Sequence, residues 1–250
     1  MTQNILNQQI VYPEIVHPEV IELQAVLDRL LKGCKNLKVL EAGCGSASYI
    51  KIGETPYFVG IDISEKQLER NSDLHEKILG DLQTYNLPAS AFDVIVCWNV
   101  LEHLSQPERA LDNFIRAIKE EGLIIIAVPN VVSVWGVITK YTPLWFHTWV
   151  YRNIFGEKRA GNHDFGPFPT YSKASISPTA IKHFALTKGL SIQYLNLYEN
   201  YRQEGVRKKL RLVGSVWNFI KAIVTTLTFG KIDAEHTDYI IVLTKRIKDV

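Results

Sequence analysis

The sequence is poor in cysteine, with only three residues and no C-x-x-C pair among them. Disulfide frameworks and structural zinc sites both need paired or clustered cysteines, so neither is expected. The first nine residues are polar and lack the basic start and apolar core of a secretory signal. We therefore expect a cytoplasmic protein with reduced thiols and no bound metal.

The chain also lacks a strong charge of either sign, because 28 basic and 26 acidic residues leave a formal net charge of +2. Nucleic-acid binding usually requires a concentrated basic face, so no nucleic-acid partner is expected. No internal repeat or low-complexity segment is present. With 250 residues, 46% of them hydrophobic, the chain can bury a full core. We expect one domain over residues 1–250, with insertions at 131–171 and 205–231.

No apolar run is a clear membrane span. The longest one, residues 212–230, contains Lys221 near its centre and follows a basic cluster at residues 207–211. A lysine at the centre of a bilayer costs about 3 kcal/mol, and the chain must return to supply its last strand, so we expect a helix rather than a span. Its broad apolar face fits a lid or an interface, and peripheral membrane contact is a further interpretation.

Glycines follow an acidic residue at the end of the first apolar run. Residues 37–40 lead to Glu41, and the turn behind it contains Gly43 and Gly45. Glycine permits a sharp turn and leaves no Cβ between the backbone and a ligand. A second apolar run ends in Asp62, about twenty residues later, where nucleoside-binding folds place the carboxylate that binds ribose. Together the two features predict a nucleoside-type cofactor.

The turn lacks the third glycine of the dinucleotide pattern G-x-G-x-x-G, because that position is Ser48. No regular helix is expected before Pro56, so a pyrophosphate would have no helix N-terminus. Residues 41–47 resemble the E/D-x-G-x-G-x-G motif of class I S-adenosylmethionine-dependent methyltransferases, with Ala47 in place of the last glycine. S-adenosylmethionine has no phosphate to hold. It is the cofactor that the resemblance implies.

The resemblance covers residues 37–130 well and residues 177–244 more loosely. Residues 78–82 are similar to the third strand of that family, residues 92–104 to its fourth strand with the "LEHL" segment, and residues 122–129 to its fifth. Apolar runs alternate with helical segments, which favours parallel strands. The resemblance implies a Rossmann-like, doubly wound α/β fold whose seven-stranded, mostly parallel sheet ends in an antiparallel strand. The predicted strands are 37–42, 57–61, 77–80, 92–97, 123–128, 191–198 and 239–244, and the predicted helices are 18–32, 64–70, 107–119 and 177–188.

The same resemblance assigns cofactor contacts to the ends of the first four strands. The turn meets the methionine portion, the second strand ends at the ribose, the third at the adenine, and the fourth beside the methyl group. Glu41 either fixes the turn or reaches the cofactor ammonium through water. The residues implied are Glu41, Gly43, Cys44, Gly45, Asp62, Ile63, Asp81, Leu82, Cys97 and Trp98.

His103 is the candidate catalytic base, because it follows the fourth strand and histidine titrates near neutrality. A histidine that only caps the helix start is an equally good interpretation. Glu102 beside it is a weak metal signal without a third ligand. His163 and Asp164 form a loop that either faces the pocket or is solvated, and Tyr12 is a candidate to cover the cofactor.

Residues 131–171 are rich in aromatic side chains and follow the fifth strand, at the edge where the cofactor would bind. We expect this insertion to form a lid over the site, although many of its rings would also suit the core of a helical subdomain. The substrate-binding candidates are Trp145, Phe146, His147 and Tyr171. The expected acceptor is a small or lipid-like molecule, methylated at oxygen. The alternatives are an NAD(P)-dependent oxidoreductase and a cofactor-binding module without catalysis.

Overall fold

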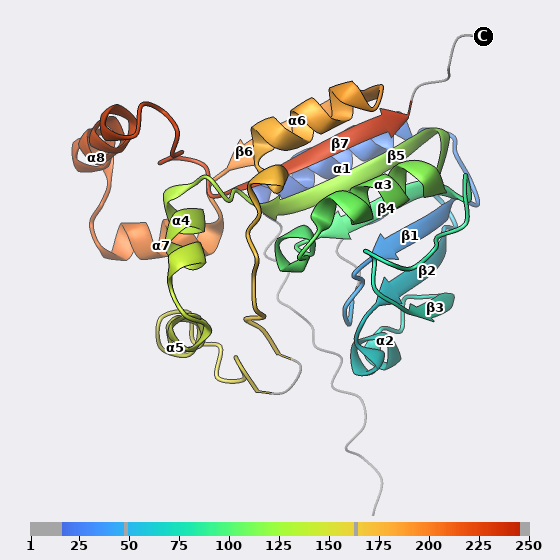
Figure 1. Ribbon diagram of the computed structural model, residues 1–250, viewed down its shortest axis with the longest axis horizontal. Coiled ribbons are helices and arrows are strands. Elements are labelled where there is room, and N and C mark those ends of the chain that lie inside the picture. The colour runs from blue at the N-terminus through green and yellow to red at the C-terminus, as the bar shows by residue number, and fades with distance from the viewer. Residues whose placement is uncertain (1–16, 48–49, 163–164, 246–250) are drawn as a thin grey trace, which may run out of the picture.

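The computed structural model describes residues 17–47, 50–162 and 165–245 (Figure 1). The predictions made for residues 1–9, Tyr12, Ser48, His163 and Asp164 lie outside these ranges.

A single seven-stranded sheet runs through the molecule in the order β3-β2-β1-β4-β5-β7-β6. Strands β1 to β5 pair in parallel, and β7 is antiparallel to both of its neighbours. This is the predicted fold class, with its antiparallel last strand. The strands are β1 Lys38–Ala42, β2 Tyr57–Asp62, β3 Glu76–Leu79, β4 Phe92–Trp98, β5 Ile118–Pro129, β6 Leu190–Tyr198 and β7 Asp238–Lys245.

Two hydrophobic clusters cover the two faces of the sheet, because successive side chains of a strand point to opposite faces. In β1, Val39 joins the cluster under α1 and Leu40 joins the cluster under α3 and α6. Strand β5 lies between β4 and β7, and its residues 123–128 are buried on both faces of the sheet, which explains their unbroken apolar run. The helices of this core are α1 Pro18–Leu30, α2 Glu65–Arg70, α3 Pro107–Ala117 and α6 Pro178–Thr187, with 3-10 turns η1 Leu101–His103 and η2 Ala174–Ile176.

The start of β5 differs from the prediction. The helix α3 ends at Ala117, and β5 begins at once with Ile118, which is fully buried and pairs with Phe92. Lys119 extends from the strand to Asp93, with Nζ 2.8 Å from Oδ1. Lys and Glu favour helices in isolation, so the predicted helix 107–119 was too long. Burial of Ile118 overrides that weak local preference.

Four further helices lie beyond the carboxyl ends of β1 and β4, on the left of Figure 1. Helices α4 Val134–Tyr141 and α5 Leu144–Asn153 belong to the aromatic insertion, residues 131–171. Helices α7 Tyr201–Lys209 and α8 Gly214–Leu227 belong to the segment between β6 and β7. We call residues 201–231 the α7–α8 segment, which starts four residues before the insertion expected at 205–231.

Candidate cofactor and active site

The turn after β1 depends on two glycines with different surroundings. Both have a left-handed backbone, with φ of +71° at Gly43 and +53° at Gly45. A Cβ at Gly43 would lie 2.4 Å from Cγ2 of Val100, behind the end of β4. A Cβ at Gly45 would meet no atom of the described residues within 4 Å. Gly43 thus permits close packing of the turn, whereas Gly45 faces open space at the carboxyl edge of the sheet.

The Asp62 carboxylate connects the turns that follow β1 and β2. Its Oδ2 accepts the backbone N–H of Gly45 at 2.9 Å, and its Oδ1 accepts that of Ser64 at 2.8 Å. A carboxylate has lone pairs to accept more than these two bonds, so Asp62 can also bind ribose hydroxyls. The next side chain, Ile63, is 75% exposed at the same edge. An exposed apolar side chain beside a held carboxylate suits a nucleoside.

Asn71 also holds this turn, and the sequence analysis missed it. Its side chain is fully buried at the end of α2, and Nδ2 donates to the carbonyl oxygens of Cys44 and Gly45, both at 3.4 Å. The Cys44 backbone is held on both sides, because its N–H also donates to the Ile61 carbonyl at 3.2 Å, and the Cys44 thiol is buried. Burial, with the nearby Asp62 and Glu41, raises the pKa of that thiol to about 12, so it stays neutral. Glu41 is also buried.

After β3, Asp81 is held by Gln83, a second residue that the sequence analysis missed. Oδ1 of Asp81 accepts from the Gln83 backbone N–H at 2.8 Å and from its Nε2 at 3.0 Å. Gln83 Oε1 in turn accepts from Ser105 Oγ at 3.0 Å and from the Gln106 backbone at 2.8 Å. Gln83 thus connects the predicted adenine-binding loop, through hydrogen bonds, to Ser105 and Gln106, which follow η1 in the sequence.

Three of the predicted contact residues direct little of their side chains to this edge. Leu82 and Cys97 are buried members of the core under α3 and α6. Burial, together with the negative charge of Glu102, raises the pKa of the Cys97 thiol, so it is no nucleophile. Trp98 is half-buried and packs against the cluster under α1. These residues have only backbone or partial side-chain surface available for a cofactor.

The "LEHL" segment forms η1, and the returning part of the aromatic insertion runs along it. The backbone N–H of Tyr171 donates to the carbonyl of Glu102 at 2.8 Å. Nδ1 of His103 lies 2.8 Å from the carbonyl oxygen of Pro169, and the His103 ring meets the Phe168 ring edge-on at 6.0 Å. A carbonyl only accepts, so Nδ1 carries the proton and Nε2 keeps its lone pair. Burial lowers the pKa of His103, which favours this neutral form.

The side chain of Glu102, the middle residue of η1, is buried, and its Oε2 has no hydrogen-bond partner among the described residues. Burial, reinforced by the charge of Asp238, raises the pKa of Glu102 to about 8. The carboxyl is therefore mostly protonated at neutral pH. A folded-state pKa above the unfolded one means that the folded protein binds the extra proton between the two values.

We expect Glu102→Gln to remove a pH dependence of stability. In the wild type, the contribution of this group is fully present below its ordinary pKa of 4.5 and is lost as pH rises to about 8. The loss is at most about 1.4 kcal/mol per pH unit, whereas glutamine stays neutral throughout. Urea unfolding of both proteins between pH 5 and pH 9 tests this. Parallel stability curves would show that Glu102 is ionised in the folded protein.

The aromatic insertion reaches across several strands. The guanidinium of Arg70, at the end of α2, lies 5.7 Å from the Phe165 ring centre. The Phe168 ring contacts His103 in η1, the turn that follows β4. The chain between these two rings therefore passes from the β2 side of the carboxyl edge to the β4 side. This path is the one that a lid over the cofactor would take.

The predicted substrate residues do not form one described cluster. Trp145, 71% exposed, and Phe146 meet edge-on at 6.0 Å on α5. On the same helix His147 Nε2 lies 2.7 Å from Thr142 Oγ1, and burial lowers the pKa of His147. Tyr171 is half-exposed beside η1. No contact given for the described residues joins Tyr171 to the α5 trio, and their role in substrate binding stays a prediction.

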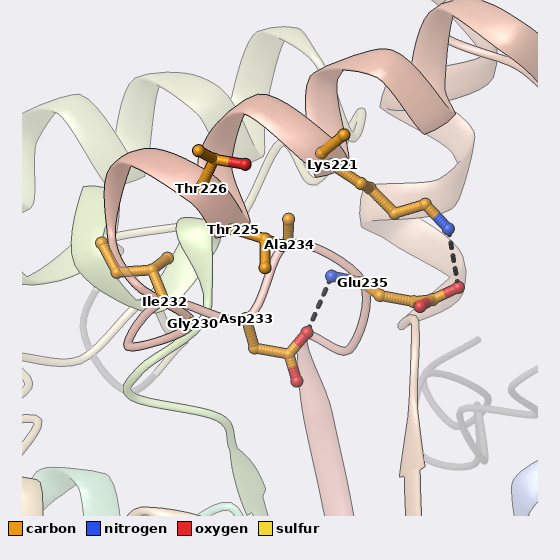
Figure 2. A pocket seen from close by; sticks show the side chains of 9 residues that line it. Lys221, Thr225, Thr226, Gly230, Ile232, Asp233, Ala234 and Glu235 are labelled. Atoms are coloured by element: carbon orange, nitrogen blue, oxygen red, sulfur yellow. Dashed lines mark hydrogen bonds and ion pairs between the residues drawn. The ribbon is translucent and has the colours of Figure 1, made fainter.

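A pocket of about 590 Å³ lies between α8 and residues 230–235 (Figure 2). Its charged side chains are already paired: Lys221 Nζ lies 2.8 Å from Glu235 Oε1, and Asp233 accepts the Glu235 backbone N–H at 2.8 Å. None of the predicted site residues lines it. Over the described ranges, no three His, Cys, Asp or Glu side chains gather in a way that would hold a metal ion.

The family described as "Methyltransferase domain" matches residues 19–163, which include β1 to β5 and the turns described above. The chain belongs to this family. The match ends within the aromatic insertion, so the α7–α8 segment lies outside it. The family and the fold confirm the predicted class, a methyltransferase domain of Rossmann-like fold whose cofactor is S-adenosylmethionine.

Curated relatives match only part of the chain. A tRNA (carboxymethyluridine(34)-5-O)-methyltransferase of Arabidopsis thaliana is 30% identical over 42% of this chain and 28% of its own length. A probable S-adenosylmethionine-dependent methyltransferase of Mycolicibacterium smegmatis is 25% identical over 44% of this chain and 45% of the relative. A ubiquinone biosynthesis O-methyltransferase of Coxiella burnetii is 25% identical over 63% of this chain and 65% of the relative. The chain thus spans less than two thirds of these proteins.

Among solved structures, Haemonchus contortus phosphoethanolamine N-methyltransferase 2, in complex with S-adenosylmethionine, aligns with a TM-score of 0.54. The alignment covers 91% of this chain and 53% of that one, at 14% identity. A likeness at this identity shows the fold.

Proposed function

We propose that this protein transfers the methyl group of S-adenosylmethionine to an oxygen of a small, lipid-like acceptor. The observation that carries the cofactor part is the Gly45–Asp62 hydrogen bond of 2.9 Å beside the open side of Gly45. Support for oxygen comes from relatives named as O-methyltransferases, among them enzymes of ubiquinone biosynthesis.

Residues that follow β1, β2, β3 and β4 each have a separate role in binding the cofactor or in the reaction. S-adenosylmethionine supplies a methyl group on a sulfonium, which a nucleophile takes in an in-line displacement, so alignment is the main requirement. Gly43 and Gly45 bring the backbone close, Asp62 accepts from the ribose hydroxyls, and Asp81 with Ile63 binds the adenine end. His103 takes the proton of the acceptor hydroxyl on Nε2.

The lipid-like character of the acceptor rests on the aromatic insertion. Where the insertion returns along η1, the Phe168 ring meets the His103 ring and the Tyr171 backbone donates to Glu102, and these two aromatic residues are 44% and 54% exposed. Large exposed rings next to a reaction site favour a hydrophobic acceptor over a charged one.

Asp62→Ala should weaken S-adenosylmethionine binding by about 1.5 to 3 kcal/mol, because it removes charge-assisted hydrogen bonds to the ribose and to Gly45. Titration calorimetry on the folded variant measures the change. Asp112→Ala is the matched control, since that carboxylate lies on α3 and pairs with Lys188 at 2.7 Å. An unchanged dissociation constant for Asp62→Ala would refute the ribose assignment, and tighter binding of NAD to the wild type would refute the cofactor.

The acceptor class is tested with methyl-labelled S-adenosylmethionine and host-cell extract. We expect label in an organic-solvent-soluble product that mass spectrometry identifies as a methyl ether. Label in RNA or protein would contradict the lipid-like acceptor. Cofactor binding without any labelled product would favour the non-catalytic alternative.

A further inference from the structure

Helices α4, α5, α7 and α8 contain no buried residue, whereas α1, α2, α3 and α6 each bury at least one. The unburied helix α8 is nevertheless apolar. Its sequence alternates Val, Trp, Phe and Ile with few polar residues. A helix of this composition normally buries a stripe against its own protein. Here α8 lies at the far left of Figure 1, away from the sheet.

One side of α8 is occupied by its own chain. The guanidinium of Arg207 lies 5.2 Å from the Trp217 ring centre. Lys221 pairs with Glu235 across the pocket, where Thr225 and Thr226 also line the wall (Figure 2). These contacts determine which face of α8 is turned toward the protein and which face is exposed to solvent.

The outward side is a continuous apolar stripe. Its members recur at the three- and four-residue spacing that places side chains along one helix face, and they are between 41% and 74% exposed. We call them the α8 face: Val216, Phe219, Ile223 and Leu227. Phe229, just after the helix, is 89% exposed and extends it. Such an exposed apolar stripe marks an interaction surface.

The charge around the α8 face indicates what covers it. Residues 201–231 contain seven Lys or Arg and one Glu. Arg202, Arg207 and Lys221 pair with Glu157, Glu199 and Glu235 from outside the segment, which reduces its formal charge from +6 to +3, still above the +2 of the whole chain. A second copy of the protein, related by a two-fold axis, would bring two such segments together, which like-charge repulsion opposes. An anionic bilayer can satisfy both features of the segment: its headgroups attract the basic residues, and its hydrocarbon boundary takes up the apolar stripe.

We propose that the α7–α8 segment is a peripheral membrane-binding surface, in which the α8 face enters the interface of an anionic bilayer and Lys208 and Lys209 contact the headgroups. Among the described residues no single helix is long and apolar enough to span a bilayer, and α7 and α8 reach that length only as a pair bent by 114°. The surface adds to the proposed methyl transfer and does not depend on the identity of the acceptor.

Vesicle flotation at low salt tests the surface. We expect the full-length protein to float with vesicles of phosphatidylcholine and phosphatidylserine mixed two to one, to stay soluble with phosphatidylcholine alone, and to lose binding as salt is added. The double substitution Phe219→Ser with Ile223→Ser should lower the partition coefficient at least tenfold, because two apolar side chains no longer enter the interface. Lys208→Ala with Lys209→Ala should lower it about tenfold.

Leu186→Ser is the matched control, since Leu186 is 69% exposed on α6, outside the α7–α8 segment, and its partitioning should equal that of the wild type. Circular dichroism confirms that each variant is folded, which is expected because the α8 face contacts no core. A wild type that stays soluble with both vesicle types, or a Phe219/Ile223 variant that floats normally, would overturn the proposal. A dimer that this variant dissociates would assign the α8 face to a second copy instead. None of these outcomes bears on S-adenosylmethionine binding.

Discussion

Gly43→Ala is expected to destabilise the fold by about 2–5 kcal/mol, because a left-handed backbone costs alanine about 1–2 kcal/mol and overpacking adds about 1–3 kcal/mol. Gly43 has a φ of +71°, and its new Cβ would lie 2.4 Å from Val100. Urea unfolding at neutral pH measures the loss. A loss below about 1 kcal/mol would show that Val100 moves aside at little cost.

Gly45→Ala is the matched control for that variant. Its φ of +53° gives the same kind of backbone cost, but within the ranges that the structure describes its Cβ would meet no atom within 4 Å. We therefore expect a loss of only about 1–2 kcal/mol in stability. Because the open side of Gly45 faces the proposed cofactor, affinity for S-adenosylmethionine should fall tenfold or more. Unchanged affinity would show that the cofactor approaches from another direction.

The sequence predicts the sheet well because each strand of the core has a strong local signal. The apolar runs around Val39, Val59, Ile95 and Ile125 are buried in the sheet, and each ends near its predicted position. The exception is the start of β5, where buried Ile118 begins the strand inside a helix-favouring sequence. That outcome depends on pairing with Phe92, a contact that no local pattern contains.

The sequence predicts the backbone of the site better than its side chains. Gly45 and Asp62, both predicted at the carboxyl edge of the sheet, lie in hydrogen-bond contact because their strands are neighbours in parallel register. Asn71 and Gln83 were missed, since a single amide after a helix or strand has no distinctive spacing. The direction of the Cys97 side chain could not be predicted either, because a strand buried on both faces shows no alternation of polar and apolar residues.

The insertions are the least predictable part, because their composition fits several environments. Aromatic residues in 131–171 suit a core, a lid or an exposed surface equally, and only the contacts of Phe165 with Arg70 and of Phe168 with His103 trace the path of the chain across the strand ends. Likewise the apolar residues of α8 suit burial, but the structure leaves the α8 face exposed.

His103→Ala should lower turnover about a hundredfold or more and leave the S-adenosylmethionine dissociation constant unchanged, because the general base is lost while the cofactor contacts remain. The reason lies in the hydrogen bond from Nδ1 to the Pro169 carbonyl, 2.8 Å long, which leaves the lone pair on Nε2, an atom that lies 3.8 Å from Oε1 of Glu102. Burial lowers the pKa of His103 below 6.5. A base acts when deprotonated, so wild-type turnover should be constant above pH 6.5 and fall in more acidic solution, and single-turnover rates measured across this range test the assignment.

The variant His103→Asn distinguishes the role of His103 as general base from its role as a hydrogen-bond donor to the Pro169 carbonyl. The asparagine amide can donate to the Pro169 carbonyl as Nδ1 does, which keeps the returning insertion against η1, but it has no basic nitrogen. If His103 is the base, the asparagine variant should be as slow as the alanine variant and should lose the acidic limb of the pH profile. Near-normal turnover of His103→Asn would contradict the base assignment. It would show instead that His103 positions the insertion over the site, and that the acceptor loses its proton to another group or to water.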